Sequence, residues 1–435
     1  MNLRRLLGIA IGVFCLVPLL GQKTEVLKGK RQPTELIEQP WVFGTEVIKH
    51  WQNLPSQVNA PANRTRAYPG QHLTIAIGAR GDLRDQLLKA GTYSFTVTVG
   101  TNSSTFNNLH PTQLRRIKAE GADFALAALH AAQITSGEAE TMLSMVSFAL
   151  FDLDWVAPQG TNDGAISVKA KVVGANGAVR DLQERNVEFW SYERLAKEGG
   201  FKDKEEQGNW MMGYYQRPEP TRLLHLFRGS KDDKNAFKPN MRAFYRQVLK
   251  SDPAAAQDLL TRLRSEEPVV RMVGVVAFLD AGYPLPAILE TMSVEDQERF
   301  KLIPSKIEPL PDPFDLVPDV NNFIKVPNAF DMLWSQFLAT GDAEPVRAIA
   351  GALQWRKEGQ AFLALRKSGK KPDGITLELA KGLSYMAAGW SLGSFYRNHP
   401  LVTDYIEAWK KDASVPLIIR EELGTLMANE AFQRD

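Results

Sequence analysis

The sequence predicts a multidomain α+β protein in which an antiparallel β-sandwich is followed by an all-α array of helical hairpins. Three observations support this fold class. The chain has 435 residues, more than one ordinary compact domain needs. Apolar residues recur with a period of two between residues 67 and 190, and with a helical period beyond residue 210. The composition, 44% apolar and 23% charged, is that of a folded globular chain.

Residues 1–21 have the pattern of a secretory signal peptide. Arg4 and Arg5 precede an uncharged apolar run over residues 6–20. That run is shorter than the roughly 20 apolar residues of a membrane-spanning helix. We therefore expect cleavage near Gly21 and export to the periplasm or the extracellular space, with an uncleaved N-terminal anchor as the alternative. Residues 22–66 are expected to form an extended N-terminal segment.

Cysteine usage and charge exclude several classes of site. Cys15 is the only cysteine and lies inside the apolar run, so the mature chain would have no disulfide, thiolate metal site or cysteine nucleophile. Such a chain suits a bacterial periplasm, where a large core can supply the stability. A net charge of +2 gives little long-range attraction to phosphates, so no nucleic-acid partner is expected. No cofactor is expected, because dinucleotide and phosphate-binding fingerprints are missing from the sequence.

Residues 67–195 are predicted to form the β-sandwich. In "GTYSFTVTVG" apolar residues alternate with Thr and Ser, which is typical of a strand with one packed and one wet face. Residues 73–77, 149–155 and 166–172 alternate in the same way, and Asn176-Gly177 provides the turn chemistry that reverses a strand. Together these strands predict a sandwich of immunoglobulin-like type.

Two further segments divide the chain. Pro111 can begin a helix, and the alanine-rich "ADFALAALHAAQ" continues it after Gly121. We therefore expect a helical insertion in the sandwich near residues 111–135. The polar residues 196–209, "AKEGGFKDKEEQGN", are expected to be a linker to the second half.

Residues 210–435 are predicted to form helical hairpins. In "FDMLWSQFLATGDAEPVRAIAGAL" a first helix carries an apolar stripe from Phe330 to Leu338, "ATGD" ends it, and Pro345 lies in the first turn of a second helix. The same plan recurs in "WMMGYYQRPEPTRLLHLF" and "WSLGSFYRNHPLVTDYIEAW". A proline-rich loop at residues 304–326 interrupts the hairpins. Stacked hairpins of this kind predict an α-solenoid-like array.

With these hairpins, residues 210–435 resemble tetratricopeptide-like and HEAT-like helical-repeat proteins. The likeness is one of architecture, since no fixed period of about 34 or 40 residues runs through the segment and the tetratricopeptide signature is not matched. With its exported β-domain, the chain also resembles secreted bacterial proteins of uncharacterised function. The resemblance implies a surface for a protein or peptide partner and implies no activity.

One literal enzyme motif occurs, the Gly-x-Ser-x-Gly of residues 389–393. In an α/β-hydrolase, Ser391 would be the nucleophile, with a buried strand before it and an acid and then a histidine after it. Instead, residues 375–390 carry a helical apolar stripe, and no acidic residue separates Ser391 from His399, the last histidine. We therefore predict an ordinary serine on a close-packed helix face, and a capping or surface role for His399.

Acidic residues provide the only metal candidates. Asp152 and Asp154 share one face of a predicted strand, and Asp163 follows in the next loop, so their oxygens could bind Ca²⁺. The simpler interpretation is that this face reaches solvent at the strand end, because no full calcium-loop pattern is present. No catalytic, cofactor-binding or metal residue is therefore assigned.

The sequence favours a non-catalytic exported scaffold or binding protein, with a protein or peptide partner and no integral membrane domain after signal cleavage. Tyr214, Tyr215, Phe395 and Tyr396 could anchor such a partner, although aromatic residues at these positions are more often core. The alternative is a hydrolase or carbohydrate-active enzyme with an acidic site between the domains, using residues such as Asp152. A third hypothesis is a calcium-stabilised envelope module.

Overall fold

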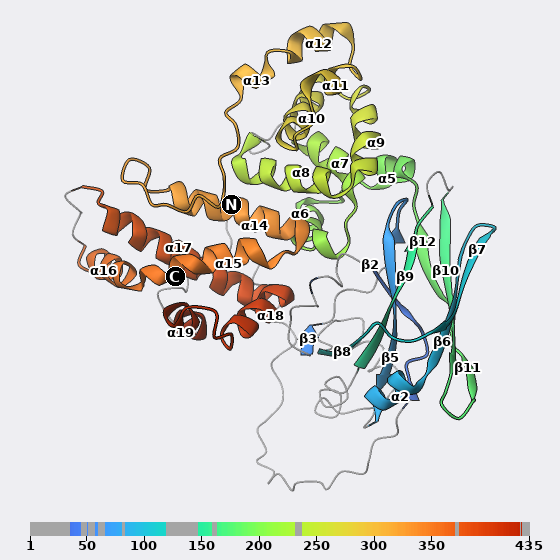
Figure 1. Ribbon diagram of the computed structural model, residues 1–435. Helices are drawn as coiled ribbons and strands as arrows, with labels where there is room; N and C mark the ends of the chain where they lie inside the picture. The colour runs from blue at the N-terminus through green and yellow to red at the C-terminus, as the bar shows by residue number, and fades with distance from the viewer. Residues whose placement is uncertain are drawn as a thin grey trace, which may run out of the picture.

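The computed structural model describes residues 35–44, 50, 57–59, 66–80, 83–118, 147–158, 163–230, 237–369, 374–426 and 428. The predicted signal peptide and the alanine-rich part of the predicted insertion lie outside the described residues. The described fold is mixed α+β, as predicted. The sheets come first, and helices make up the second half of the chain (Figure 1).

Two sheets, each of six strands among the described residues, form the N-terminal half. Sheet A has the order β1 (Glu35–Leu36), β5 (His72–Arg80), β9 (Ser147–Val156), β8 (Gln113–Lys118) and β3 (Gln57–Asn59), with β2 (Trp41–Gly44) also paired to β5. Sheet B has the order β4 (Arg66–Ala67), β12 (Arg185–Phe189), β10 (Gly164–Val173), β6 (Thr92–Val99) and β7 (Asn102–Leu109), with β11 (Val179–Asp181) paired to β10. The pairs β3–β8 and β4–β12 are parallel and the other pairs are antiparallel.

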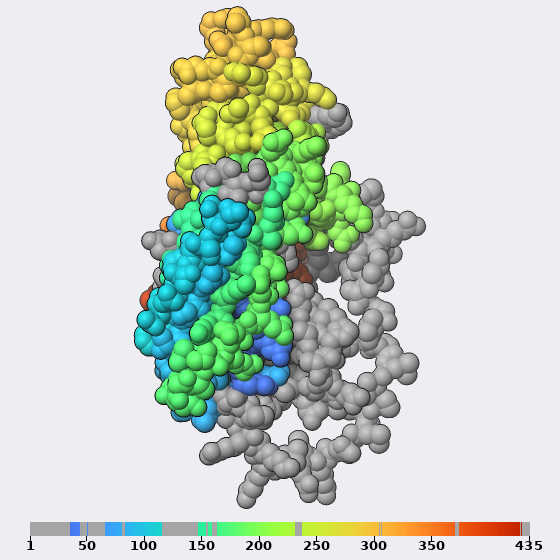
Figure 2. Space-filling model, turned by 90° about the vertical axis from the view of Figure 1, so that its right-hand side faces the viewer, coloured from blue at the N-terminus to red at the C-terminus, as the bar shows by residue number. Residues whose placement is uncertain are grey.

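The two sheets face one another across a shared core. Ile75 and Ile77 of β5 lie in one cluster with Phe95 and Val97 of β6. Phe151 of β9 contacts the ring of Phe95 at a centroid distance of 4.8 Å. The opposite side of β6 alternates with this buried face, as the period of two predicts, and carries Thr and Ser. Figure 2 shows the outer side of sheet B, over which cyan and green strands face the viewer.

Sheet A, in contrast, is buried on both faces over most of β5 and over residues 147–151 of β9. All residues of β5 between its two ends are buried, Thr74 included, so the expectation of one wet face is wrong for this strand. The second face has a different partner from the first. Phe43, Phe148 and Leu150 belong to the same apolar cluster as the helical half of the chain. Sheet A therefore lies between sheet B and the helices (Figure 1).

The predicted helical insertion is wrong where it can be compared. Residues 113–118 form strand β8, which pairs antiparallel with β9 through Leu114 opposite Ala149. Thr112 also joins this edge, because its backbone N–H and its hydroxyl both donate to the carbonyl of Leu150 at 2.9 Å. Pairing with an apolar strand thus overrides the helix-starting tendency of Pro111.

Helices follow from residue 192 onward. Their bounds are α5 (Tyr192–Glu198), α6 (Lys204–Met212), η2 (Tyr214–Gln216), η3 (Pro220–Arg222), α7 (Leu223–Gly229), α8 (Pro239–Ser251), α9 (Pro253–Leu263), α10 (Pro268–Asp280), α11 (Leu285–Leu289), α12 (Val294–Phe300), α13 (Ile303–Lys306), α14 (Lys325–Thr340), α15 (Ala343–Gly351), η5 (Ala352–Trp355), α16 (Arg356–Lys367), α17 (Leu377–Asn398), α18 (Pro400–Trp409) and α19 (Leu417–Thr425). One short helix, α2 (Arg84–Ala90), lies in the sheet half. None of the described helices is long and apolar enough to cross a bilayer.

Two of the predicted hairpins are present, α14–α15 and α17–α18, whereas in the third the short 3₁₀ helices η2 and η3 separate α6 from α7. Gly341 ends α14 with a φ of +75°, a conformation that glycine adopts without strain, and α15 packs back on α14. Tyr405 of α18 fastens this turn by donating its hydroxyl to the Gly341 carbonyl at 2.7 Å. The expected linker at 196–209 is more ordered than its composition suggests, because Asp203 caps α6 and Trp210 is buried.

The helices do not stack only with their sequence neighbours. α8 packs along α14, although α9 to α13 lie between these two helices in the sequence. Arg242 of α8 holds the beginning of the segment that leads from α13 to α14. It binds both oxygens of Asp280, at 2.7 and 2.8 Å, and donates to the carbonyl of Glu308 at 2.9 Å. The predicted proline-rich loop corresponds to the irregular residues 307–324 between α13 and α14.

Glycines bring α16 and α17 unusually close. A Cβ on Gly382 would lie 2.7 Å from the carbonyl oxygen of Glu358 and 2.8 Å from the Cβ of Phe362. A Cβ on Gly359 would lie within 2.0 Å of the ring of Tyr385. The helix pair therefore depends on the absence of side chains at these two positions.

Gly382→Ala should destabilise the protein by about 1–3 kcal/mol, because overpacking exceeds the gain in helix propensity. Gly208→Ala in α6 is the matched control, since its Cβ would meet no atom within 4 Å. That variant should be more stable than the parent by about 0.5–1 kcal/mol. Urea unfolding measures both changes. A Gly382→Ala protein as stable as the parent would show that α16 and α17 can separate without cost.

Candidate functional site

Ser391 lies in the middle of α17, as predicted, and not on a strand-to-helix turn. Its hydroxyl donates to the carbonyl of Ala388 at 3.2 Å, a bond within its own helix. The small-residue face is close-packed, with Ser384 and Ala388 buried. Trp390, on the large apolar stripe of the same helix, is 36% exposed. The geometry is that of a structural serine.

His399 lies at a cap position as expected, between α17 and α18, where its backbone N–H donates to the carbonyl of Phe395, but the expected surface role is wrong because the side chain is buried. The residue is 4% exposed and contacts the rings of Tyr215, Phe337 and Phe395. Its Nε2 lies 3.3 Å from the carbonyl of Met212, which it reaches as a donor in the neutral imidazole form. Burial lowers the pKa of His399 from 6.5 to about 4. At neutral pH the ring is therefore an uncharged part of the aromatic core.

The three candidate calcium ligands, Asp152, Asp154 and Asp163, have no shared role among the described contacts. Asp163 accepts a hydrogen bond from the backbone N–H of Ser191, the residue before α5, at 2.7 Å. Asp152 is exposed on β9. The side chain of Asp154 lies outside the described part of the chain. Among the described residues, no three His, Cys, Asp or Glu side chains are grouped to hold a metal ion.

The candidate aromatic anchors contribute to the core. Tyr214 and Tyr215 are buried in η2. Phe395 stacks on Trp334 with the rings 3.8 Å apart and 4° from parallel. Tyr396 donates its hydroxyl to Glu407 at 2.5 Å. The more common role of such residues, core packing, therefore holds for these four.

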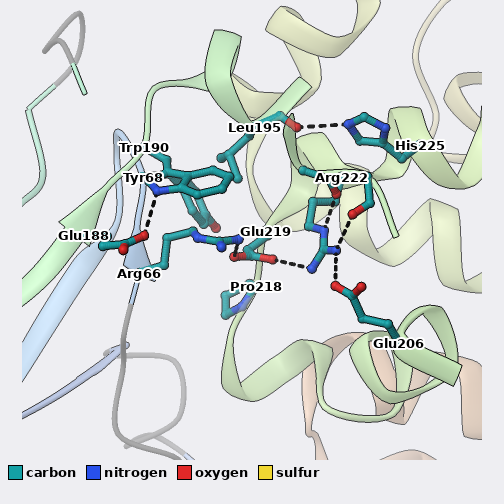
Figure 3. Close-up of polar contacts among 12 residues, drawn as sticks. Arg66, Tyr68, Glu188, Trp190, Leu195, Glu206, Pro218, Glu219, Arg222 and His225 are labelled. Atoms are coloured by element: carbon teal, nitrogen blue, oxygen red, sulfur yellow. Dashed lines mark hydrogen bonds and ion pairs between the residues drawn. The ribbon is translucent and has the colours of Figure 1, made fainter. Parts of the chain in front are cut away.

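Charged residues gather where the two halves meet, and we name Arg66, Trp190, Glu206, Glu219 and Arg222 the joint (Figure 3). Arg66 of β4 binds Glu219 at 3.1 Å, and Arg222 binds the other oxygen of Glu219 at the same distance. Arg222 also binds Glu206 at 2.8 Å. The ions thus alternate in sign from the sheet half into the helical half.

Apolar and backbone contacts complete the joint. The guanidinium groups of Arg66 and Arg194 lie on the ring of Trp190, at 3.6 and 4.2 Å from its centroid. The Trp190 indole N–H donates to Glu188 at 2.9 Å. Arg222, with a side chain 8% exposed, donates to the carbonyls of Gly199 and Gly200 at 2.6 and 3.3 Å. Figure 3 shows these side chains pointing toward one another from both halves.

The chemistry of the joint is that of a fixed connection. Glu206 accepts from the backbone N–H of Lys202 and from Arg222, and these two hydrogen bonds lower the pKa of its carboxyl group. Burial lowers the pKa of His225, which lies 3.0 Å from the carbonyl of Leu195. An ionised carboxylate held by arginine and a neutral imidazole engaged with the backbone are poorly suited to proton transfer. The joint therefore positions the two halves.

A cleft of about 400 Å³ opens where α5 meets α7 and the turn between α9 and α10. Its lining residues are Glu193, Ala196, Lys197, Leu224, Arg228, Arg262, Ser265 and Glu266. Arg228 binds both oxygens of Glu266, at 2.9 and 2.5 Å, and this pairing raises the Arg228 pKa. Arg262 is held by Asp258 at 2.7 Å. The guanidinium charges in the cleft are therefore already neutralised by protein carboxylates.

Sequence reasoning missed the joint. "RPEPTRLL" looks like an exposed polar break before a helix, and Arg66 precedes the first recognised strand. Arginine is the cation best suited to buried multidentate pairing, which is the only local signal that favours such a role. The partners of Arg222 lie 3 to 23 residues before it, and Arg66, which binds the same Glu219, lies much earlier in the chain.

Arg222→Met should destabilise the protein by about 3–5 kcal/mol, because it leaves one buried oxygen of Glu219 and the Gly199 carbonyl without the partner that they have in the parent. Arg222→Lys should lose less, since one cation remains. Arg299→Met is the control, because its exposed pair with Glu295 contributes at most about 0.5 kcal/mol. Urea unfolding at neutral pH gives all three values. Equal losses for Arg222→Met and Arg299→Met would contradict the assignment of the joint.

His399 predicts an acid-sensitive fold. Its pKa is lower in the folded chain than in the unfolded chain, so the unfolded state binds more protons between pH 6.5 and 4. Stability should therefore fall as pH falls through this range, by about 2 kcal/mol from this residue between pH 7 and pH 5. His399→Gln should lack that part of the decrease. If urea unfolding gives the same dependence of the free energy of unfolding on pH for the parent and the variant, the prediction is wrong.

Comparison of the chain with family models, with curated proteins and with solved structures gave no match. Three features of the described residues bear on function: the joint, the cleft and the exposed surface of the helical half. The joint is a structural connection, and the guanidinium charges of the cleft are neutralised by Glu266 and Asp258.

Proposed function

We propose that the protein is a non-catalytic scaffold or binding protein whose helical half contacts a protein or peptide partner. One observation carries this proposal: exposed large apolar side chains are concentrated on the helical half. In the sheet half, the described residues of this kind are Leu83, Val156 and Val179. In the helical half they are Met212, Phe237, Val269, Val294, Leu302, Phe314, Val317, Val320, Phe323, Ile324, Ile375, Leu377, Trp390 and Leu417. Where such groups lie together, as they do in sequence over residues 314–324, they are typical of interaction surfaces.

The connection between the halves supports a scaffold role. The core shared by sheet A and the helices, together with the joint, holds the helical surface in a fixed orientation relative to the sheets. A partner that binds a preorganised surface loses less conformational entropy on the protein side. Arg222 and Arg66 thus contribute to binding only through the orientation that they fix.

The finer description of the fold is part of this proposal. We propose an immunoglobulin-like sandwich, which the shared core of sheets A and B supports. We propose a solenoid-like array for residues 210–435, which the hairpins α14–α15 and α17–α18 support. The packing of α8 on α14 makes this array irregular, since it joins helices that are distant in sequence.

Export is also proposed, on the pattern of the first 21 residues. Arg4 and Arg5 followed by an apolar run are the signal of a secreted chain. The periplasm of a bacterium suits a chain whose only cysteine lies in that run. The hydrolase alternative gains no support from the junction of the halves, because Glu206 and Glu219 both accept from arginine there.

Site-specific photo-cross-linking in the native host tests this function. The full chain should carry the reactive amino acid at Val317, Trp390 or Leu417 of the helical half, or at Val179 of the β10–β11 hairpin as the control. We expect an adduct of one discrete mass from at least one helical position and none from Val179. If the helical positions give no adduct, or if Val179 gives the same one, the proposed scaffold function is wrong.

A further inference from the structure

We propose that residues 307–324, here named the strap, bind a segment of a partner protein that combines apolar side chains with Lys or Arg. The strap carries the chain from α13 to the start of α14 (Figure 1). This inference rests on the proposed function, because it names the place on the helical half where the partner docks and the chemistry of that partner.

The strap has an inner and an outer side. On the inner side, Leu310 and Leu316 pack against a small apolar cluster on α8 and α14 that includes Met332. The large apolar side chains exposed on the outer side are Phe314, Val317, Val320, Phe323 and Ile324. The inner contacts anchor the strap without covering the outer side chains. The outer side therefore offers five exposed apolar side chains within eleven residues to a partner.

Local hydrogen bonds hold the strap in one conformation. Asp312 accepts from the backbone N–H of Phe314 at 3.0 Å, and Asp319 accepts from that of Asn321 at 2.8 Å. These are Asx turns, in which a side chain replaces the backbone of a turn. Four prolines in the strap restrict the backbone further, and Arg242 holds its first part through the carbonyl of Glu308. Little conformational entropy remains to be lost on binding.

The charge of the strap selects the partner. It contains Glu308, Asp312, Asp315 and Asp319 but no Lys or Arg. Lys325 pairs with Asp315 at 2.7 Å, whereas no Lys or Arg of the described residues forms an ion pair with the other three carboxylates. An apolar partner that also carries cations complements this pattern.

The same charge disfavours other occupants. Two straps from two copies of the chain would bring like charges together, and an anionic lipid surface would be repelled in the same way. Prolines interrupt the row of backbone N–H groups, so a partner cannot pair along the whole strap as an added strand. Recognition must therefore come from side chains, which leaves a cationic and apolar protein segment.

Binding of three labelled synthetic peptides to the full chain tests the inference. The peptides have equal length and contain Lys with Phe and Leu, Glu with Phe and Leu, or Lys with Ser. Fluorescence anisotropy should show that the Lys–Phe–Leu peptide binds at least about tenfold more tightly than the other two. Its affinity should fall with rising salt concentration.

Variants locate the binding surface. Val317→Ser combined with Phe323→Ser should weaken the Lys–Phe–Leu peptide about tenfold or more. Asp312→Asn combined with Asp319→Asn keeps the oxygen acceptors of the Asx turns, and it should both weaken binding and reduce the salt dependence. Val156→Ser combined with Val179→Ser removes exposed apolar groups of the sheet half and should change the affinity less than about twofold.

The outcomes separate the inference from the function on which it rests. Equal binding of the three peptides, or equal weakening by the strap and control variants, overturns the inference. Photo-cross-linked adducts from Trp390 or Leu417 without one from Val317 would overturn the strap but leave the scaffold function standing. A failure of all helical positions to cross-link would overturn both.

Discussion

The burial of sheet A on both faces is the constraint on which the rest of the structure depends. One face of β5 and β9 packs on sheet B, while Phe148 and Leu150 face the helical half. Neither half therefore has a complete core of its own. Apolar packing between the halves is not directional, so it fixes their relative orientation less sharply than hydrogen bonds do. The directed hydrogen bonds of Arg222 in the joint provide this additional constraint.

The sequence predicts most of the fold where the signal is local. β6 and β10 were predictable because each has one wet face, so their period of two is complete. β5 alternates equally well in sequence, but Thr74 is buried and Ala76, two residues on, belongs to the apolar cluster of the helical half, which no local pattern can report. β8 was missed for the same reason: its residues favour a helix locally and become a strand by pairing with β9.

The candidate site shows the same difference between what local sequence predicts and what depends on distant segments. The structural role of Ser391 could be predicted from the sequence, because the requirements of a nucleophile elbow concern its immediate neighbours. Burial of His399 and the pairing of Arg222 depend on segments brought together by folding, so their roles were missed or misjudged. The strap was expected as a proline-rich loop, but which of its side chains face outward depends on its contacts with α8 and α14.

The pairing of α8 with α14 has a consequence for how the chain is made. α8 ends at Ser251 and α14 begins at Lys325, so the ribosome must add α9 to α13 and the strap before α8 can meet its partner. Until then the side of α8 that carries Ala243 has nothing from α14 to cover it. Such long-range pairing slows folding and keeps a nascent chain open for longer. A chain that stays open during synthesis is also one that an export channel for unfolded polypeptides can still thread.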